Sequence, residues 1–202
     1  MKFLENKQLN KITFHCIFIL SVYAILFFIR LPILVNAEVF LTSDEAFMAN
    51  DMANLFEGGQ FHFYHENVSY QGIFHSLIAI PFFWLFGISS FAFKLPSILY
   101  YTLYIWTFFL LTMRINRKFA WISVALLVLC PPGILDVTVN NYPHTLIACL
   151  GNIAFLIYLS HRDNPTYRKI FYITFIMGFS LYVYTLSAIY SAVIIFLWIM
   201  DS

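Results

Sequence analysis

The sequence predicts an all-α polytopic membrane protein, and three observations lead to this fold class. First, 61% of the 202 residues are hydrophobic and only 10% are charged, which is far outside the range of soluble domains. Second, apolar runs long enough to cross a bilayer recur along the chain. Third, most Lys and Arg residues cluster in the polar segments between these runs. The net charge is +1, and no basic face for nucleic acid remains once the Lys and Arg residues are placed in the loops, so no nucleic-acid partner is expected.

The first apolar run, 12–35, is expected to be a retained membrane span. Its uncharged part exceeds the h-region of a signal peptide, about 7–15 residues, and no small-residue cleavage site follows it. A turn is expected at 184–187, because the uncharged run 170–200 is too long for one upright helix. The later spans are expected at 95–113, 119–135, 142–160 and 170–186, with a partial sixth at 188–200, where we expect the chain to be truncated inside a helix.

The loop 36–94 between the first two spans is expected to carry two interfacial helices. The first, 43–57, begins with a capping box of Thr42 and Glu45 and has an apolar stripe that includes Met48 and Met52. The second, 73–88, has about 16 residues, short of the roughly 20 that cross a bilayer. Pro81 is expected to kink this second helix.

The distribution of basic residues decides whether 73–88 crosses the membrane. If it does not cross, nine of the eleven Lys and Arg residues share one face, which agrees with the rule that cytoplasmic loops are basic. The loop 36–94 then lies on the outer face with 131–144, and together they hold seven of the ten acidic residues. The implied site is therefore an acid-lined cavity at the outer interface.

Several short motifs follow one another in a defined order along this part of the chain. Asp44 and Glu45 lie in the first turn of the interfacial helix 43–57, where the helix dipole favours an ionised carboxylate. The motifs are S-D-E-A (43–46), E-G-G (57–59), Y-Q-G (70–72), L-F-G (85–87), F-K-L-P-S (93–97) and C-P-P (130–132).

In this order the motifs resemble the N-terminal portion of GT-C fold glycosyltransferases, which include protein O-mannosyltransferases and the aminoarabinose transferase of lipid A. The resemblance covers about residues 41–187. It implies a GT-C-like N-terminal transmembrane module that passes a sugar from a polyprenyl-phosphate donor to a lipid, glycan or protein acceptor. It also implies an integral, multi-pass protein of the bacterial inner membrane whose active face points outward.

The resemblance assigns to Asp44 the acidic residue of the family's first outer loop, which serves as a catalytic base or as an acceptor-binding carboxylate. Glu45 matches the family's second acid, and its capping contact with Thr42 is an equally good explanation. The region where many family members carry a further acid here offers His144, with Asp136 eight residues earlier. The substrate-binding candidates are Lys94, Arg30, Tyr70, Asp136 and His144.

Three of these binding candidates have an ordinary alternative. Lys94 suits a carrier phosphate or plain interfacial anchoring, and Tyr70 suits an interfacial aromatic belt. Arg30 is expected to snorkel outward or to meet an acid, with a phosphate contact as the alternative. No cofactor is expected. A divalent metal at the outer histidines is possible but unsupported, because no pair of them has the i, i+4 spacing of a helical zinc motif.

The sequence therefore predicts a GT-C-type glycosyltransferase, with Asp44 as general base and Lys94 or Arg30 balancing the departing phosphate. The alternative is a non-enzymatic membrane protein, or a catalytically incomplete fragment, that binds a lipid carrier or a partner subunit. A transporter fits less well, because no pair of broken helices repeats in two halves.

Overall fold

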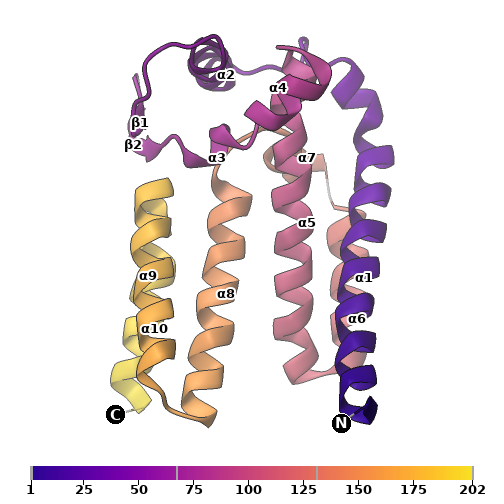
Figure 1. The fold of residues 1–202 in the computed structure, drawn as a ribbon, viewed down its shortest axis with the longest axis vertical. Helices are drawn as coiled ribbons and strands as arrows, with labels where there is room; N and C mark the ends of the chain where they lie inside the picture. The colour runs from indigo at the N-terminus through magenta and orange to yellow at the C-terminus, as the bar shows by residue number, and fades with distance from the viewer. Residues whose placement is uncertain (1, 67, 131, 202) are drawn as a thin grey trace.

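The computed structural model describes residues 2–66, 68–130 and 132–201 of the chain as a row of helices covered at one end (Figure 1). Three helices are long and apolar enough to cross a membrane: Ile12–Val35 within α1, Ser90–Ile115 (α5) and His144–Asp163 (α8). The full bounds of α1 are Lys2–Val35. The shorter helices beside them are α6 (Arg117–Val128), α9 (Tyr167–Val183) and α10 (Ala188–Asp201).

The two ends of this helical row differ in content. We call the end covered by 36–94 the capped end, and the opposite end, which holds Lys2, Asn116 and Asn164, the basic end (Figure 1). The basic end contains the same nine Lys and Arg residues that the sequence groups together, because they fall in the first turns of α1 or in the turns that join α5 to α6 and α8 to α9.

Local capping sets where α5 begins and ends. Ser89 accepts a hydrogen bond from the Ala92 N–H, so the helix starts at Ser90, five residues before the predicted range 95–113. At the other end Asn116 closes α5, and its side chain accepts hydrogen bonds from the first N–H groups of α6. Because α5 starts early, Lys94 lies inside the helix instead of preceding it.

The predicted single span 119–135 is wrong. Helix α6 ends at Val128, and a separate short helix, α7 (Pro132–Val139), follows. The physical reason is the pair of prolines at 131 and 132, which lack the N–H groups needed to continue the hydrogen bonds of α6. The chain between α7 and α8, Asn140–Pro143, lies at the capped end.

The predicted single helix 73–88 is also wrong. The structure has α3 (Phe74–Leu77) and α4 (Ile80–Phe86), with Pro81 in the first turn of α4. Proline is favourable there because its missing N–H would have no partner in a first turn. Both short helices lie at the capped end and neither runs the length of the bundle (Figure 1).

Two further features complete the capped end. Helix α2 (Ser43–Phe56) has the capping box that the sequence predicts, with both reciprocal contacts between Thr42 and Glu45. The strands β1 (Tyr64–His65) and β2 (Val68–Gly72), which the sequence analysis did not predict, form a small antiparallel hairpin. A 3₁₀ turn, Thr185–Ser187, separates α9 from α10 at the predicted turn position.

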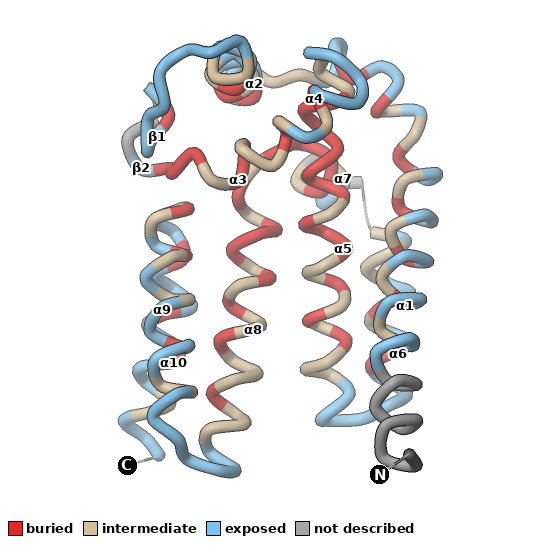
Figure 2. The backbone as a smooth tube through the Cα atoms, viewed as in Figure 1, coloured by how far each residue is buried: buried red, intermediate tan, exposed pale blue. Residues whose placement is uncertain are grey.

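The core follows α5 and α8. Buried residues line both helices, whereas α1, α9 and α10 expose much of their outer surfaces (Figure 2). These exposed surfaces are apolar, with Leu20 at 68% and Phe196 at 61% exposure. Large apolar side chains on the outside are expected where hydrocarbon replaces water.

Candidate functional site

Helix α2 presents its two adjacent acidic residues to opposite environments. Glu45, Met48 and Met52 are buried, and their i, i+3, i+7 spacing places them on one face of the helix. Asp44 precedes this face and is exposed. The apolar stripe therefore turns Glu45 into the protein and leaves Asp44 outside.

The buried carboxylate of Glu45 pairs with Lys94 of α5. Lys94 Nζ lies 2.6 Å from Glu45 Oε2, and both side chains are fully buried. The same ammonium group also donates to Asn140 Oδ1 at 2.7 Å and to the Phe40 carbonyl at 3.2 Å. The other oxygen of Glu45, Oε1, accepts the Asn141 backbone N–H at 2.7 Å. A buried ion pair needs all of these hydrogen bonds, because each charge that is buried without partners costs several kcal/mol.

This network joins three stretches that are distant in the sequence. Asn141 Nδ2 donates to the Phe93 carbonyl at 2.9 Å, and Ser97 Oγ donates to the Val139 carbonyl at 2.8 Å. The start of α2, the start of α5 and the α7–α8 connection are thereby fixed to one another. Lys94 is neither an interfacial anchor nor an open phosphate ligand in this arrangement, because its charge is matched by Glu45.

Asp44 remains the exposed carboxylate at the start of α2. It forms no hydrogen bond or ion pair with the described residues, and it lies in the first turn, where the helix dipole stabilises negative charge. The network beneath Glu45 holds the backbone that carries Asp44. A carboxylate that is exposed and carried on a fixed backbone is suited to accept a proton from a bound hydroxyl group.

The ring of Tyr184 contacts two of the predicted binding residues, Tyr70 and His144. The ring centroids of Tyr70 and Tyr184 are 5.8 Å apart, and those of Tyr184 and His144 are 5.3 Å apart. Tyr142 extends this row, with its centroid 5.7 Å from that of His144 and its hydroxyl 2.6 Å from Thr42 Oγ1. The row therefore leads from the hairpin to the N-cap of α2, two residues before Asp44.

The two other predicted binding residues lie elsewhere. Arg30 does not snorkel outward and meets no acid among the described side chains. It is fully buried, with hydrogen bonds to Thr138 Oγ1 and Cys130 Sγ and with its guanidinium 5.1 Å from the centre of the Tyr101 ring. Asp136 falls in α7, and its side chain lies outside the described residues.

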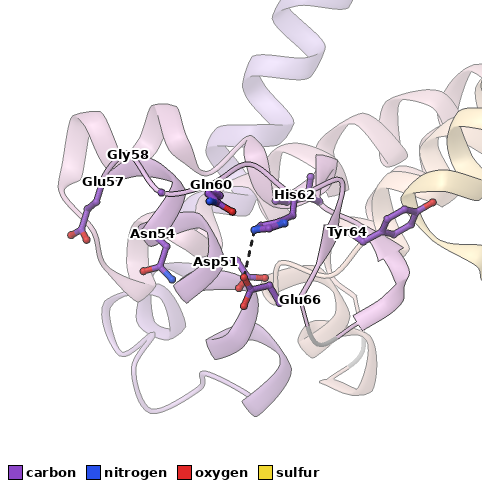
Figure 3. Close-up of a pocket in the computed structure, with 10 residues that line it drawn as sticks. Asp51, Asn54, Glu57, Gly58, Gln60, His62, Tyr64 and Glu66 are labelled. Carbon is purple, nitrogen blue, oxygen red and sulfur yellow. Dashed lines mark ion pairs between the residues drawn. The ribbon is translucent and has the colours of Figure 1, made fainter.

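A polar pocket of about 540 Å³ lies beside α2 and includes Asp51. Asp51 is seven residues after Asp44, so the two carboxylates project from the same face, two turns apart. Figure 3 shows His62 beside Glu66, with which it forms a 3.6 Å ion pair. The lining residues are Asp51, Asn54, Glu57, Gly58, Gly59, Gln60, His62, Tyr64, Glu66 and Ile73.

Behind this pocket a buried chain of hydrogen bonds begins at Asp51. Its Oδ2 lies 2.7 Å from His65 Nδ1, and His65 Nε2 lies 3.2 Å from Ser76 Oγ. Ser76 Oγ in turn lies 3.0 Å from His75 Nε2, which also accepts from Gln71 Nε2 at 3.0 Å. The Ser76 hydroxyl is fully buried, so this chain ties α2 to the hairpin and α3 and does not offer an accessible nucleophile.

Burial shifts the pKa of both histidines. It lowers the pKa of His75 to about 3, and the neighbouring His65 lowers it further while the Gly72 carbonyl opposes the shift. Burial also lowers the pKa of His65, although Asp51 offsets part of that effect. The His75 ring is therefore neutral at pH 7 and acts as a hydrogen-bonding group.

Sequence reasoning did not assign Asn140, Asn141, Asp51 or His65 to the site. The inward orientation of Glu45 could have been found from its i, i+3, i+7 spacing with Met48 and Met52. The asparagines and Asp51 carry no comparable local signal, because their partners are remote in the sequence.

Among the described residues, no group of three His, Cys, Asp or Glu side chains could hold a metal ion. Comparison of the chain with protein-family models, with curated proteins and with solved structures finds no match.

Proposed function

We propose that this protein is a multi-pass membrane glycosyltransferase of the GT-C type, or the N-terminal part of one. One observation carries the proposal. The motifs that resemble the family, S-D-E-A at 43–46 and F-K-L-P-S at 93–97, are joined by the 2.6 Å contact between Glu45 and Lys94. The same contact holds Asp44 at the exposed start of α2.

In this proposal the capped end faces the outer side of the membrane, and the setting is a bacterial inner membrane. The support is the gathering of nine of the eleven Lys and Arg residues at the basic end. Basic residues near the ends of spans favour the cytoplasmic side. The donor would then be a sugar on a polyprenyl phosphate in the membrane, and the acceptor a lipid, glycan or protein hydroxyl at the capped end.

The proposed step is an inverting displacement at the anomeric carbon of the sugar. The acceptor oxygen forms a bond to this carbon while its proton passes to Asp44. The bond from the carbon to the phosphate oxygen breaks, and the carrier phosphate leaves with the electron pair. General-base assistance of this kind contributes about 10²–10⁴ in rate.

The remaining groups of the site have supporting roles. The pair Glu45 and Lys94 positions Asp44 and does not bind the leaving phosphate. The pocket beside Asp51 suits a hydroxyl-rich acceptor, because carboxylates and side-chain amides accept and donate hydrogen bonds to sugar hydroxyls. A row of aromatic rings offers edges and faces beside α2. It consists of Tyr70, Tyr184, His144 and Tyr142.

The decisive experiment compares Asp44→Asn with Glu38→Gln in native membranes supplied with a radiolabelled polyprenyl-phosphate sugar. Glu38 is an exposed acid of the same loop outside the pocket, so its substitution controls for a general loss of negative charge. Asp44→Asn is expected to reduce sugar transfer by about 10² or more with unchanged membrane insertion. Equal transfer by both variants would show that the base is another group.

A non-enzymatic function is the second candidate, and one observation favours it. Glu45 and Lys94, two of the charged motif residues, neutralise each other in the interior and face no ligand. A protein of this kind would retain a polyprenyl phosphate in the membrane without transferring its sugar. Retention of the radiolabelled donor with no transfer by the wild-type full-length protein would favour this function.

A further inference from the structure

The last turn of α4 and the residues after it expose a group of large apolar side chains. Trp84 and Leu85 are 78% and 74% exposed, and Phe86 and Ile88 are also exposed. We call these four residues the α4 rim. The residue just before the rim, Phe83, is buried against α2. The helix therefore has a protein partner on its inner side, whereas the described residues leave its rim largely uncovered.

No charged residue accompanies the α4 rim. The chain has no Asp, Glu, Lys or Arg between Glu66 and Lys94, and Lys94 is fully buried in its pair with Glu45. By contrast, α2 exposes Asp44. The rim can thus leave water without desolvating an ionised group, whereas the exposed side of α2 cannot do so without a large cost in free energy.

The start of α5 fixes the depth of the rim along the bundle. Phe86 lies four residues before Ser90, where α5 begins, and its ring centroid is 5.7 Å from that of Phe91 in the first turn of α5. Figure 1 shows α4 at the end of the bundle where α5 begins. The rim therefore lies level with the first turn of a helix that is long and apolar enough to cross a membrane.

The length of α5 places that first turn among the lipid headgroups. The helix has 26 residues, or about 39 Å at 1.5 Å per residue. This exceeds the hydrocarbon core of a bilayer, about 30 Å, and fits within the roughly 40–45 Å that include both headgroup regions. An upright α5 centred in the bilayer therefore has each end in a headgroup region, with the rim beside one of them.

The residue types of the rim suit this depth. Tryptophan is enriched at membrane–water interfaces, because its ring is apolar and its N–H can bond to water or headgroups. The rest of the rim adds apolar area for the acyl chains. The other short helices of the capped end offer no such surface, because the apolar stripe of α2 is turned inward and His75 and Ser76 of α3 are fully buried.

We propose that the α4 rim inserts into the bilayer leaflet at the capped end, at the boundary between headgroups and acyl chains. The partner of this surface is the lipid itself, as the depth, the lack of charge and the residue types require. Insertion is expected to reach about 5–10 Å, the usual depth of interfacial helices. It would hold the capped end against the membrane while α2 remains in water. This contact is independent of the proposed sugar transfer.

The test measures the fluorescence of Trp84 in the full chain, reconstituted in phosphatidylcholine vesicles. Trp106, Trp121 and Trp198 are replaced by phenylalanine, so that Trp84 alone emits. Lipids brominated near the headgroup end of their acyl chains should quench this emission more than lipids brominated near the chain ends, and aqueous iodide should quench it little. The matched control carries Gln60→Trp and Trp84→Phe in the same chain, and its emission should respond to iodide and not to brominated lipid.

A second measurement keeps every tryptophan and decides the matter if the replaced chain does not fold. Leu85→Cys is labelled with the fluorophore NBD in a chain whose Cys16, Cys130 and Cys149 have been changed to serine or alanine. Dithionite added to the water reduces only labels that water reaches. The label at 85 should therefore be reduced much more slowly than a label at Gln60→Cys.

Four results would overturn the proposal. Quenching of Trp84 by iodide and not by brominated lipid would place the rim in water, as would equal reduction of the labels at 85 and 60. Protection of Trp84 from both quenchers would show that a second copy of the chain or another protein covers the rim. Strongest quenching by bromine near the chain ends would place α4 deep in the hydrocarbon and not at its boundary.

Discussion

Lys94 Nζ and Glu45 Oε2 lie 2.6 Å apart, and both side chains are fully excluded from solvent. The two residues are separated by 49 positions in the sequence, so their contact fastens α2 to α5 of the helical bundle. Asn140 and Asn141 complete the hydrogen bonds of this pair.

Removing only the lysine of this pair should destabilise the protein strongly. Lys94→Met leaves the Glu45 carboxylate buried without a counter-charge, which is expected to cost about 3–5 kcal/mol of unfolding free energy. Glu45→Gln combined with Lys94→Met removes both charges and retains an acceptor for the Asn141 N–H, so the double variant should be more stable than Lys94→Met alone. Denaturant unfolding in detergent measures the unfolding free energy of both variants. A double variant no more stable than Lys94→Met alone would show that the two residues do not act as a pair.

Stability should decrease in acid because of His75. The unfolded chain binds a proton near pH 6.5, the ordinary histidine pKa, whereas the buried ring does so only near pH 3. The contribution of His75 is therefore complete above about pH 6.5 and is lost as the pH falls toward about 3, with a slope of about 1.4 kcal/mol per pH unit.

His75→Gln should reduce this slope, and unfolding measured from pH 7 to pH 4 in detergent tests it. The groups that face the ring are His65, Ser76, Gln71, His144 and the carbonyls of Gly72 and Asn141. His62→Gln is the control, because His62 is an exposed histidine of the same loop. An unchanged slope in His75→Gln would mean that His75 is not the residue that titrates.

Gly72→Ala should destabilise the contact between β2 and α9. A Cβ atom at this position would lie 2.6 Å from the Tyr182 carbonyl oxygen and 2.8 Å from its ring, closer than such atoms approach. We expect a loss of about 1–3 kcal/mol, the usual cost of overpacking.

Gly178→Ala within α9 is the matched control for Gly72→Ala. Nothing lies within 4 Å of its added Cβ, and alanine favours the helix by about 0.5–1 kcal/mol. The two variants should therefore shift the thermal unfolding temperature in opposite directions. A common direction would show that the close approach at Gly72 does not limit stability.

Gln60 and Asn164 should react with an impermeant thiol reagent from opposite sides of the membrane. Gln60 follows α2 at the capped end, and Asn164 ends α8 at the basic end (Figure 1). Each would be replaced by cysteine in a chain whose Cys16, Cys130 and Cys149 have been changed to serine or alanine. Labelling of both positions from the same side would contradict the proposed topology, in which 73–88 does not cross.

Much of the local structure could be predicted from the sequence. Apolar runs of membrane length marked α1, α5 and α8, and the capping box of Thr42 and Glu45 marked the start of α2. These features depend on residues within one or two helical turns of one another, so the sequence contains both partners of each interaction. The breaks in 73–88 and 119–135 were misjudged, although prolines marked both, because hydrophobicity alone does not distinguish one helix from two.

The site depended on tertiary structure. No local pattern indicates that Lys94 meets Glu45 and Asn140, or that Arg30 is buried beside Thr138, 108 positions away. The charge and capping preference of each residue are properties of the sequence. Tertiary structure decides which charges neutralise each other and which carboxylate remains exposed. The decisive contact is the one between the segment that carries α2 and the helical bundle, because Glu45 and Lys94 can be buried only if they meet across it.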